Sequence, residues 1–140
     1  MHQEVAGMLV SWTATAPGSR HFPATERTSP IADLTDHFTA LRSHGQGYLE
    51  IRLHGDEFPL LTLGFLNDRA VIHLFDTAEK QSLLIGDGTT PADTAVHLPI
   101  MDDLAAFSGD NIIAVDRAWT LIRHYIQTGT PGAPGAWREI

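Results

Sequence analysis

Residues 115–128 carry the pattern that most constrains the fold, because their apolar side chains recur with the period of an α-helix. The apolar positions of this face are Val115, Ala118, Trp119, Ile122 and Ile126. The polar side chains between them take the opposite face. Gly129 is placed to end the helix in the left-handed conformation, and Pro131 prevents its continuation. The segment therefore predicts a helix with one buried face, which needs a second layer of structure to pack against.

A second helix is predicted near residue 30, with Ser29 as its N-cap and Pro30 at its first helical position. Its buried face would consist of Ile31, Leu34, Phe38 and Leu41. Gly45 and Gly47 are expected to end it.

Between the two helices a meander of strands is predicted. In residues 48–54 apolar side chains alternate with polar ones, which is typical of a half-buried strand, whereas residues 60–66 are more apolar throughout and so predict a more central strand. The expected strands cover residues 48–54, 60–66, 70–75, 82–85 and 94–98, with a tight turn at Asn67-Asp68. A further strand is expected within residues 4–14 and a short closing strand at Trp137, whereas residues 15–29 are predicted to form a loop. Residues 101–111 fit no single element, although Phe107 is expected to anchor them to the core.

These elements predict an α+β fold in one domain over residues 1–140. We expect a mostly antiparallel sheet of about five to six strands with two amphipathic helices packed on it. Trp119 should be buried, and Trp137 should pack where the last strand closes the sheet. The order of the strands does not follow from the sequence.

The balance of charge limits the partners that such a domain can bind. The chain has 17 acidic residues against 9 Lys and Arg, a formal net charge of −8. This charge argues against binding to nucleic acid or to an anionic membrane, and it favours a basic protein partner. Solubility alone is the alternative reason for an acidic surface. With no cysteine, no membrane-length apolar run and no secretory signal, we expect a cytoplasmic protein.

A search for catalytic chemistry yields little. The eight histidines lack the spacing of a zinc site, and the sequence contains neither a nucleophile elbow nor a phosphate-binding loop. We therefore expect no enzyme activity, no cofactor and no metal. The alternative of an enzyme would require several of His54, Asp56, His73 and His97 to converge in one cleft.

Two parts of the chain resemble a known family. The first is the C-terminal part, with apolar residues 112–115, Ala118, Tyr125-Ile126, Thr128-Gly129-x-Pro131 and Trp137. The second is the middle part, residues 47–75, with an L-x-L-G motif at residues 61–64. Together they resemble the Imm type 1 family of immunity proteins from bacterial polymorphic toxin systems. The resemblance implies an intracellular antidote that occludes the active site of a cognate toxin, often a nuclease or a nucleic-acid deaminase, without a cofactor.

For the interface with such a basic toxin we predict acidic residues in turns, because a charged rim accelerates association. These residues are Asp56, Glu57, Asp87, Asp93, Asp102, Asp103 and Asp110. Each of them could also be an ordinary solvated charge. The alternative function is a scaffold domain that binds a small ligand or a protein other than a toxin, for which an open sheet face with an unfilled pocket would be the signature.

Overall fold

The computed structural model describes residues 9–15, 26–53, 57–77, 79–86, 88–100, 103–128 and 137–139. Its strands are β1 (Leu9–Thr15), β2 (Arg27–Pro30), β3 (Gln46–Leu53), β4 (Leu60–Leu66), β5 (Arg69–Phe75), β6 (Gln81–Leu84), β7 (Ala95–Ile100), β8 (Asp103–Ser108), β9 (Ile113–Ala114) and β10 (Trp137–Glu139). Its helices are α2 (Ile31–His44), α3 (Val115–Thr128) and the short 3-10 helix η1 (Gly109–Asn111).

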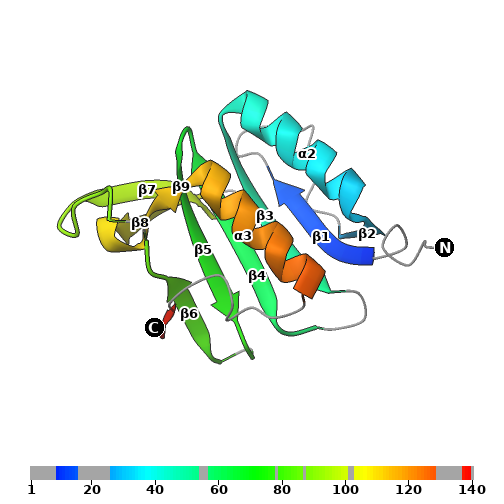
Figure 1. The fold of residues 1–140 in the computed structure, drawn as a ribbon. Helices are drawn as coiled ribbons and strands as arrows, with labels where there is room; N and C mark the ends of the chain where they lie inside the picture. The colour runs from blue at the N-terminus through cyan, green and yellow to red at the C-terminus, as the bar shows by residue number, and fades with distance from the viewer. Residues whose placement is uncertain are drawn as a thin grey trace.

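The main sheet is antiparallel and has the strand order β10-β6-β5-β4-β3-β1-β2, with β9 paired to β5 (Figure 1). Strands β7 and β8 form a separate two-stranded sheet. The α+β class with two helices is therefore confirmed, but the expected five to six strands were too few, since the main sheet alone has 8. The additional strands are short ones, such as β2 and β9, whose few residues carry no clear alternation.

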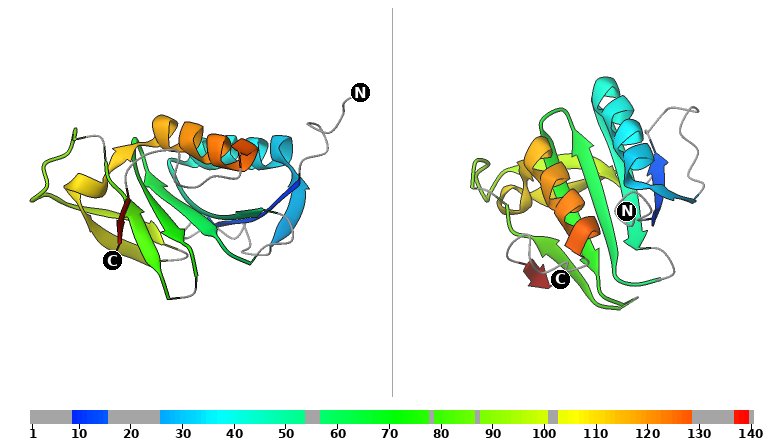
Figure 2. Two further views of the ribbon diagram at one scale, coloured as in Figure 1. Left: turned by 60° about the horizontal axis from the view of Figure 1, so that its bottom comes forward. Right: turned by 45° about the vertical axis from the view of Figure 1, so that its right-hand side comes forward.

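Both helices cover one face of the main sheet, and the larger core lies between them and the strands (Figures 1 and 2). Phe38 of α2 stacks on Trp119 of α3 with ring centroids 4.3 Å apart, which joins the two helices above the sheet. Trp119 is buried, as predicted, and Trp137 is half-buried against the same core. Within the described residues, neither helix is long and apolar enough to cross a membrane.

The hairpin β7–β8 packs on the opposite face of the sheet, over one end of β3, β4 and β5 (Figure 2). A second, smaller core forms there from Val71, Leu83, Val96, Leu98 and Ile112. Phe107 of β8 packs against it, which confirms the expected anchor. The closest approach is at Gly64, where a Cβ atom would lie 2.2 Å from the carbonyl oxygen of Pro99. Among the described residues, the hairpin covers only part of this face.

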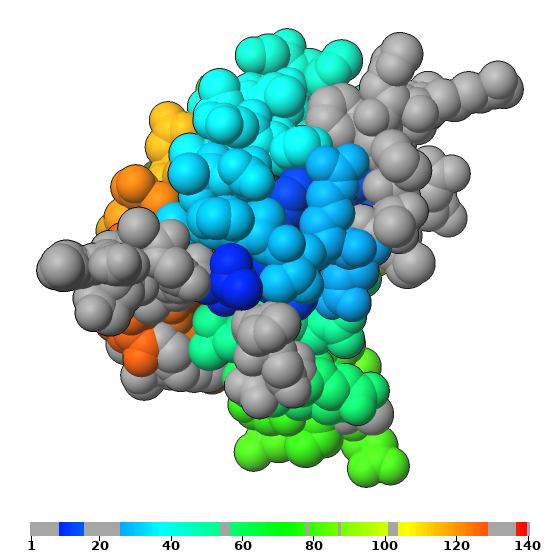
Figure 3. Space-filling model, turned by 90° about the vertical axis from the view of Figure 1, so that its right-hand side faces the viewer, coloured from blue at the N-terminus to red at the C-terminus, as the bar shows by residue number. Residues whose placement is uncertain are grey.

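Strand β2 lies where we expected a loop that leads into a helix cap. Ser29 belongs to this edge strand, and its hydroxyl accepts a hydrogen bond of 2.9 Å from the indole of Trp12. The N-cap of α2 is Pro30, without a side-chain capping bond, so the prediction of Ser29 as N-cap was wrong. Pairing of β2 with β1 places Ser29 in a strand, and its hydroxyl therefore does not cap α2. Figure 3 shows this side of the molecule, where β1, β2 and α2 lie next to one another.

Gly45 ends α2 as predicted, with φ of 89° and a backbone N–H that donates to Leu41 and Arg42. Replacing Gly45 with Ala is expected to lower the free energy of unfolding by about 1 kcal/mol, because a Cβ atom disfavours the left-handed conformation. Gly45→Asn should lose less, since asparagine tolerates this conformation better. Urea denaturation of the three proteins checks this. Equal losses for Ala and Asn would contradict the backbone explanation.

Candidate binding face

The side chains of the main sheet that point away from the helices form a surface that we call the far face. Beside the hairpin and partly beneath it, cross-strand pairing aligns the side chains of this face in two lateral rows. The row nearer the hairpin contains Thr13, Glu50, Thr62 and His73. The outer row contains Ser11, Arg52, Leu60, Phe75 and Gln81. Since strands lie about 4.8 Å apart, each row spans several strands of rigid backbone.

Glu50 lies at the centre of the inner row and is held by its neighbours on the sheet. Its Oε2 atom accepts a hydrogen bond of 3.0 Å from the Tyr48 hydroxyl. Its Oε1 atom accepts a longer one, 3.5 Å, from Thr13. The carboxylate is half-buried, and within the described part of the chain it has no cationic partner. The sheet therefore presents an oriented negative charge.

The two titratable groups near Glu50 are neutral at physiological pH. Burial, followed by the nearby Glu50 carboxylate, raises the pKa of the Tyr48 hydroxyl, so this group remains a proton donor to Glu50. Burial lowers the pKa of His73 from 6.5 to about 4. The His73 ring lies in an aromatic contact, edge-on to Phe107 of the hairpin with centroids 5.4 Å apart. The ring is also stacked with Phe75, with centroids 6.0 Å apart.

The cation of the outer row is already engaged. Arg52 forms an ion pair with Glu26, which precedes β2. Glu26, Glu50 and Arg52 together leave this part of the far face with one net negative charge. At the adjacent end of the sheet, the described turn residues include the acids Glu57, Asp76 and Glu79 and the cation Lys80. The far face and this end of the sheet are thus acidic.

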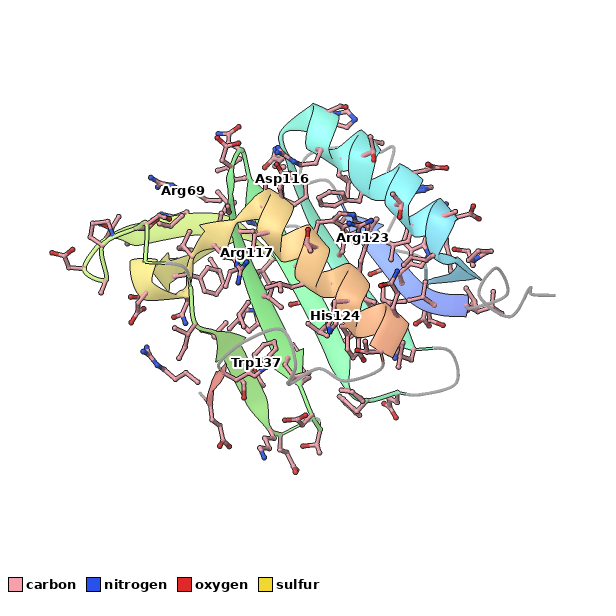
Figure 4. All side chains as sticks on the ribbon, in the orientation of Figure 1. Arg69, Asp116, Arg117, Arg123, His124 and Trp137 are labelled. Carbon is pink, nitrogen blue, oxygen red and sulfur yellow. The ribbon has the colours of Figure 1, made fainter. Side chains whose placement is uncertain are left out.

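The outer surface of α3 has a different electrostatic character. Figure 4 shows Arg117, Arg123 and His124 along the outer surface of α3, and all three residues are exposed. Asp116, also exposed on this helix, pairs with Arg42 of α2 at 3.2 Å. A basic partner would therefore meet cations on the α3 side and carboxylates on the far face.

The acidic residues predicted for the interface do not form one patch in the part of the chain that the structure describes. Asp56, Asp87 and Asp102 lie outside the described residues, as does the side chain of Asp103, whose backbone begins β8. Glu57 is exposed between β3 and β4. Asp93 and Asp110 lie near each other at the hairpin, because the Gly109 amide donates to the Thr94 carbonyl at 2.9 Å. Glu57 and this pair are separated by the length of the sheet strands.

Asp110 differs from an ordinary solvated acid. Its carboxylate pairs with Arg138 of β10 at 3.1 Å. Hydrogen bonds from Ser108 and from the Arg138 guanidinium lower the pKa of this carboxyl below its ordinary value. Its charge is therefore partly satisfied within the protein, which makes it less available to a partner than Glu50.

The residues named for an enzyme do not converge among those described. His73 lies on the far face beneath Phe107, whereas His97 is exposed on β7. Neighbours of His97 on the same strand, Val96 and Leu98, point into the second core. His97 therefore points away from the sheet. His54 and Asp56 lie outside the described residues. Among the described residues, no group of three or more His, Asp or Glu side chains could hold a metal ion.

A hollow of about 430 Å³ lies at the opposite end of the sheet, between the β4–β5 turn and β7. Its lining includes Asn67, Asp68, Arg69 and His97. This hollow is separate from the two rows of the far face.

No protein-family model matches this chain, and a comparison with curated proteins finds no match. The resemblance to Imm type 1 immunity proteins therefore depends on the motifs in the C-terminal and middle parts of the sequence.

Glu50 is not among the residues predicted for the interface, although the sequence carries a signal for it. Tyr48, Glu50 and Arg52 alternate with the buried residues Leu49 and Ile51, which places the three polar side chains on one face of β3. The prediction places interface charges in turns, whereas a charged residue in the middle of a central strand is the rarer arrangement.

Proposed function

We propose that this protein is a cytoplasmic immunity protein that binds a basic toxin domain and occludes its active site. The observation that carries the proposal is the far face, where Tyr48 orients the half-buried Glu50 carboxylate and no described residue supplies it with a cationic partner. The formal net charge of −8 also favours association with a basic partner. The resemblance to immunity proteins suggests that the toxin is a nuclease or a nucleic-acid deaminase.

The geometry suits inhibition better than it suits catalysis. A pleated sheet holds its side chains at fixed spacing, so a partner docks without ordering a flexible loop first. The face combines aromatic groups, Phe75 and Phe107, with a charged group, Glu50, and such combinations are common at the centres of protein interfaces. The hairpin β7–β8 stands beside the two rows and would form one wall of the docking site.

The test is co-expression with the product of the adjacent reading frame. We expect a stoichiometric complex with a basic domain on affinity purification, and we expect co-expression to restore the growth of cells that the partner alone arrests. A catalytically inactive variant of the partner should still bind. If a toxin-like neighbour is present but neither binds nor is neutralised, the proposal is wrong.

The hollow beside Arg69 and His97 favours a second candidate function, the binding of a small ligand. Its volume of about 430 Å³ lies in the range of ligand sites. Native mass spectrometry of protein purified from its host would detect a retained molecule. Retention of such a molecule, lost on Arg69→Ala substitution, together with the absence of a protein partner would favour this second function.

A further inference from the structure

The Glu50 carboxylate has unused capacity for hydrogen bonds. An ionised carboxylate offers about four lone-pair sites. Tyr48 occupies one of them at 3.0 Å, and Thr13 makes a long contact of 3.5 Å with another. The two donors fix the orientation of the carboxylate without neutralising it. A half-buried charge in this condition is stabilised by any cation that approaches from the open side.

The surrounding side chains of the described structure do not supply that cation. Arg52, two residues along β3 on the same face, is engaged by Glu26. His73, separated from Glu50 by one strand, is neutral because burial lowers its pKa to about 4. Thr62, which lies between them, is uncharged and buried. A cation that pairs with Glu50 would therefore come from outside the described residues.

We infer that Glu50 is the anchor of the binding face and receives an arginine side chain of the partner. A guanidinium group donates two parallel hydrogen bonds to a carboxylate, which fits the remaining acceptor sites better than the single point charge of an ammonium group. The identity of the partner rests on the proposed function. The chemistry of the anchor follows from the far face alone, so the two can fail separately.

The anchor can be tested without the toxin. The probe is N-acetyl-L-arginine methylamide, titrated into ¹⁵N-labelled protein at tens of millimolar. The matched control is the citrulline analogue, which has the same shape and no charge. We expect the arginine probe to shift the amide signals of Tyr48, Glu50 and Thr62, and we expect the citrulline probe to leave them unchanged. In Glu50→Gln, which keeps an acceptor for Tyr48, the arginine shifts should disappear.

The same variant is then measured with the partner from the co-expression experiment. Glu50→Gln is expected to weaken binding at least about tenfold, mainly through faster dissociation. Glu139→Gln on β10, an exposed glutamate paired in register with Ser82, removes the same charge and should change affinity less than about threefold. Circular dichroism and denaturation of Glu50→Gln establish that the variant is folded.

Two results would contradict the inference that Glu50 is the anchor. One is an arginine titration whose shifts map to the turn acids and persist in Glu50→Gln. The other is a toxin complex that Glu50→Gln and Glu139→Gln weaken equally. An arginine effect at Glu50 without any toxin partner would support the anchor and count against the immunity function. A toxin complex whose affinity does not change in Glu50→Gln would support the immunity function and count against Glu50 as the anchor.

Discussion

Replacing Gly64 with Val is expected to lower the free energy of unfolding by about 3 kcal/mol. Valine is a favourable strand residue, so local propensity alone would predict a gain. The loss arises because the new Cβ atom would lie 2.2 Å from the Pro99 carbonyl oxygen. That oxygen belongs to the backbone of β7, and therefore no side-chain rotation relieves the contact.

The hairpin must then move away from β4, and the second core opens. Leu98, which is fully buried, would become accessible to solvent. The prediction is checked by guanidinium denaturation, together with hydrogen exchange at β7 and β8. Gly88→Ala is the control, because a Cβ atom there meets nothing within 4 Å and only the positive φ of 79° is penalised. Unchanged stability of Gly64→Val, or a loss no larger than that of Gly88→Ala, would contradict the proposed contact.

Acidification should destabilise the wild-type protein more than a variant that lacks His73. The pKa of His73 is about 4 in the folded protein against an ordinary value of 6.5. Between these two values the unfolded chain binds a proton that the folded protein excludes, so stability is lost as the pH falls through 6.5 and the loss levels off below about 4. The difference corresponds to about 3 kcal/mol.

His73→Gln removes the titrating ring, and with it this loss of stability on acidification, and keeps a polar side chain of similar size. We expect the difference in unfolding free energy between wild type and variant to change by that amount from pH 7.5 to pH 4, because the remaining carboxyl groups titrate in both proteins. Phe107→Ala, which exposes the ring of His73, should raise its pKa toward the ordinary value. NMR titration of the His73 ring measures this directly. Parallel stability curves for wild type and His73→Gln would show that burial of His73 has no effect on its protonation.

The parts of the fold that could be predicted are those in which local pattern and tertiary packing agree. Helix α3 follows its hydrophobic period, and β3 follows the alternation of its side chains. Strand β4 is apolar nearly throughout, and the turn to β5 lies at Asn67, which has φ of 56°. Strand β2 could not be predicted, because its four residues become a strand only by pairing with β1. The prediction of Ser29 as a cap was wrong for the same reason. Its hydroxyl accepts a hydrogen bond from the Trp12 indole, which is distant in the sequence, so the residues next to Ser29 give no indication of this contact.

The candidate site was predictable only in its charge. An acidic surface followed from composition, but its position depends on which part of the sheet the hairpin β7–β8 covers. The position of the hairpin depends on contacts between residues far apart in the sequence. The backbone of Pro99 packs closely on Gly64, whereas Glu50 lies on the neighbouring strand β3, beyond the covered area. Alternation assigns Glu50 to the polar face of β3. It does not indicate whether that face meets a second layer or solvent.

The strand order also determines when the binding face comes into existence during folding. Strands β3, β4 and β5 are joined by short connections and can pair early, whereas β1 pairs Trp12 with Ile51 and must close a much longer loop. Thr13 therefore reaches Glu50 only after β1 has joined the sheet. A partially folded chain carries the carboxylate on its meander without the full set of donors that orients it. If the far face binds a partner as proposed, recognition would be coupled to the pairing of β1 with β3.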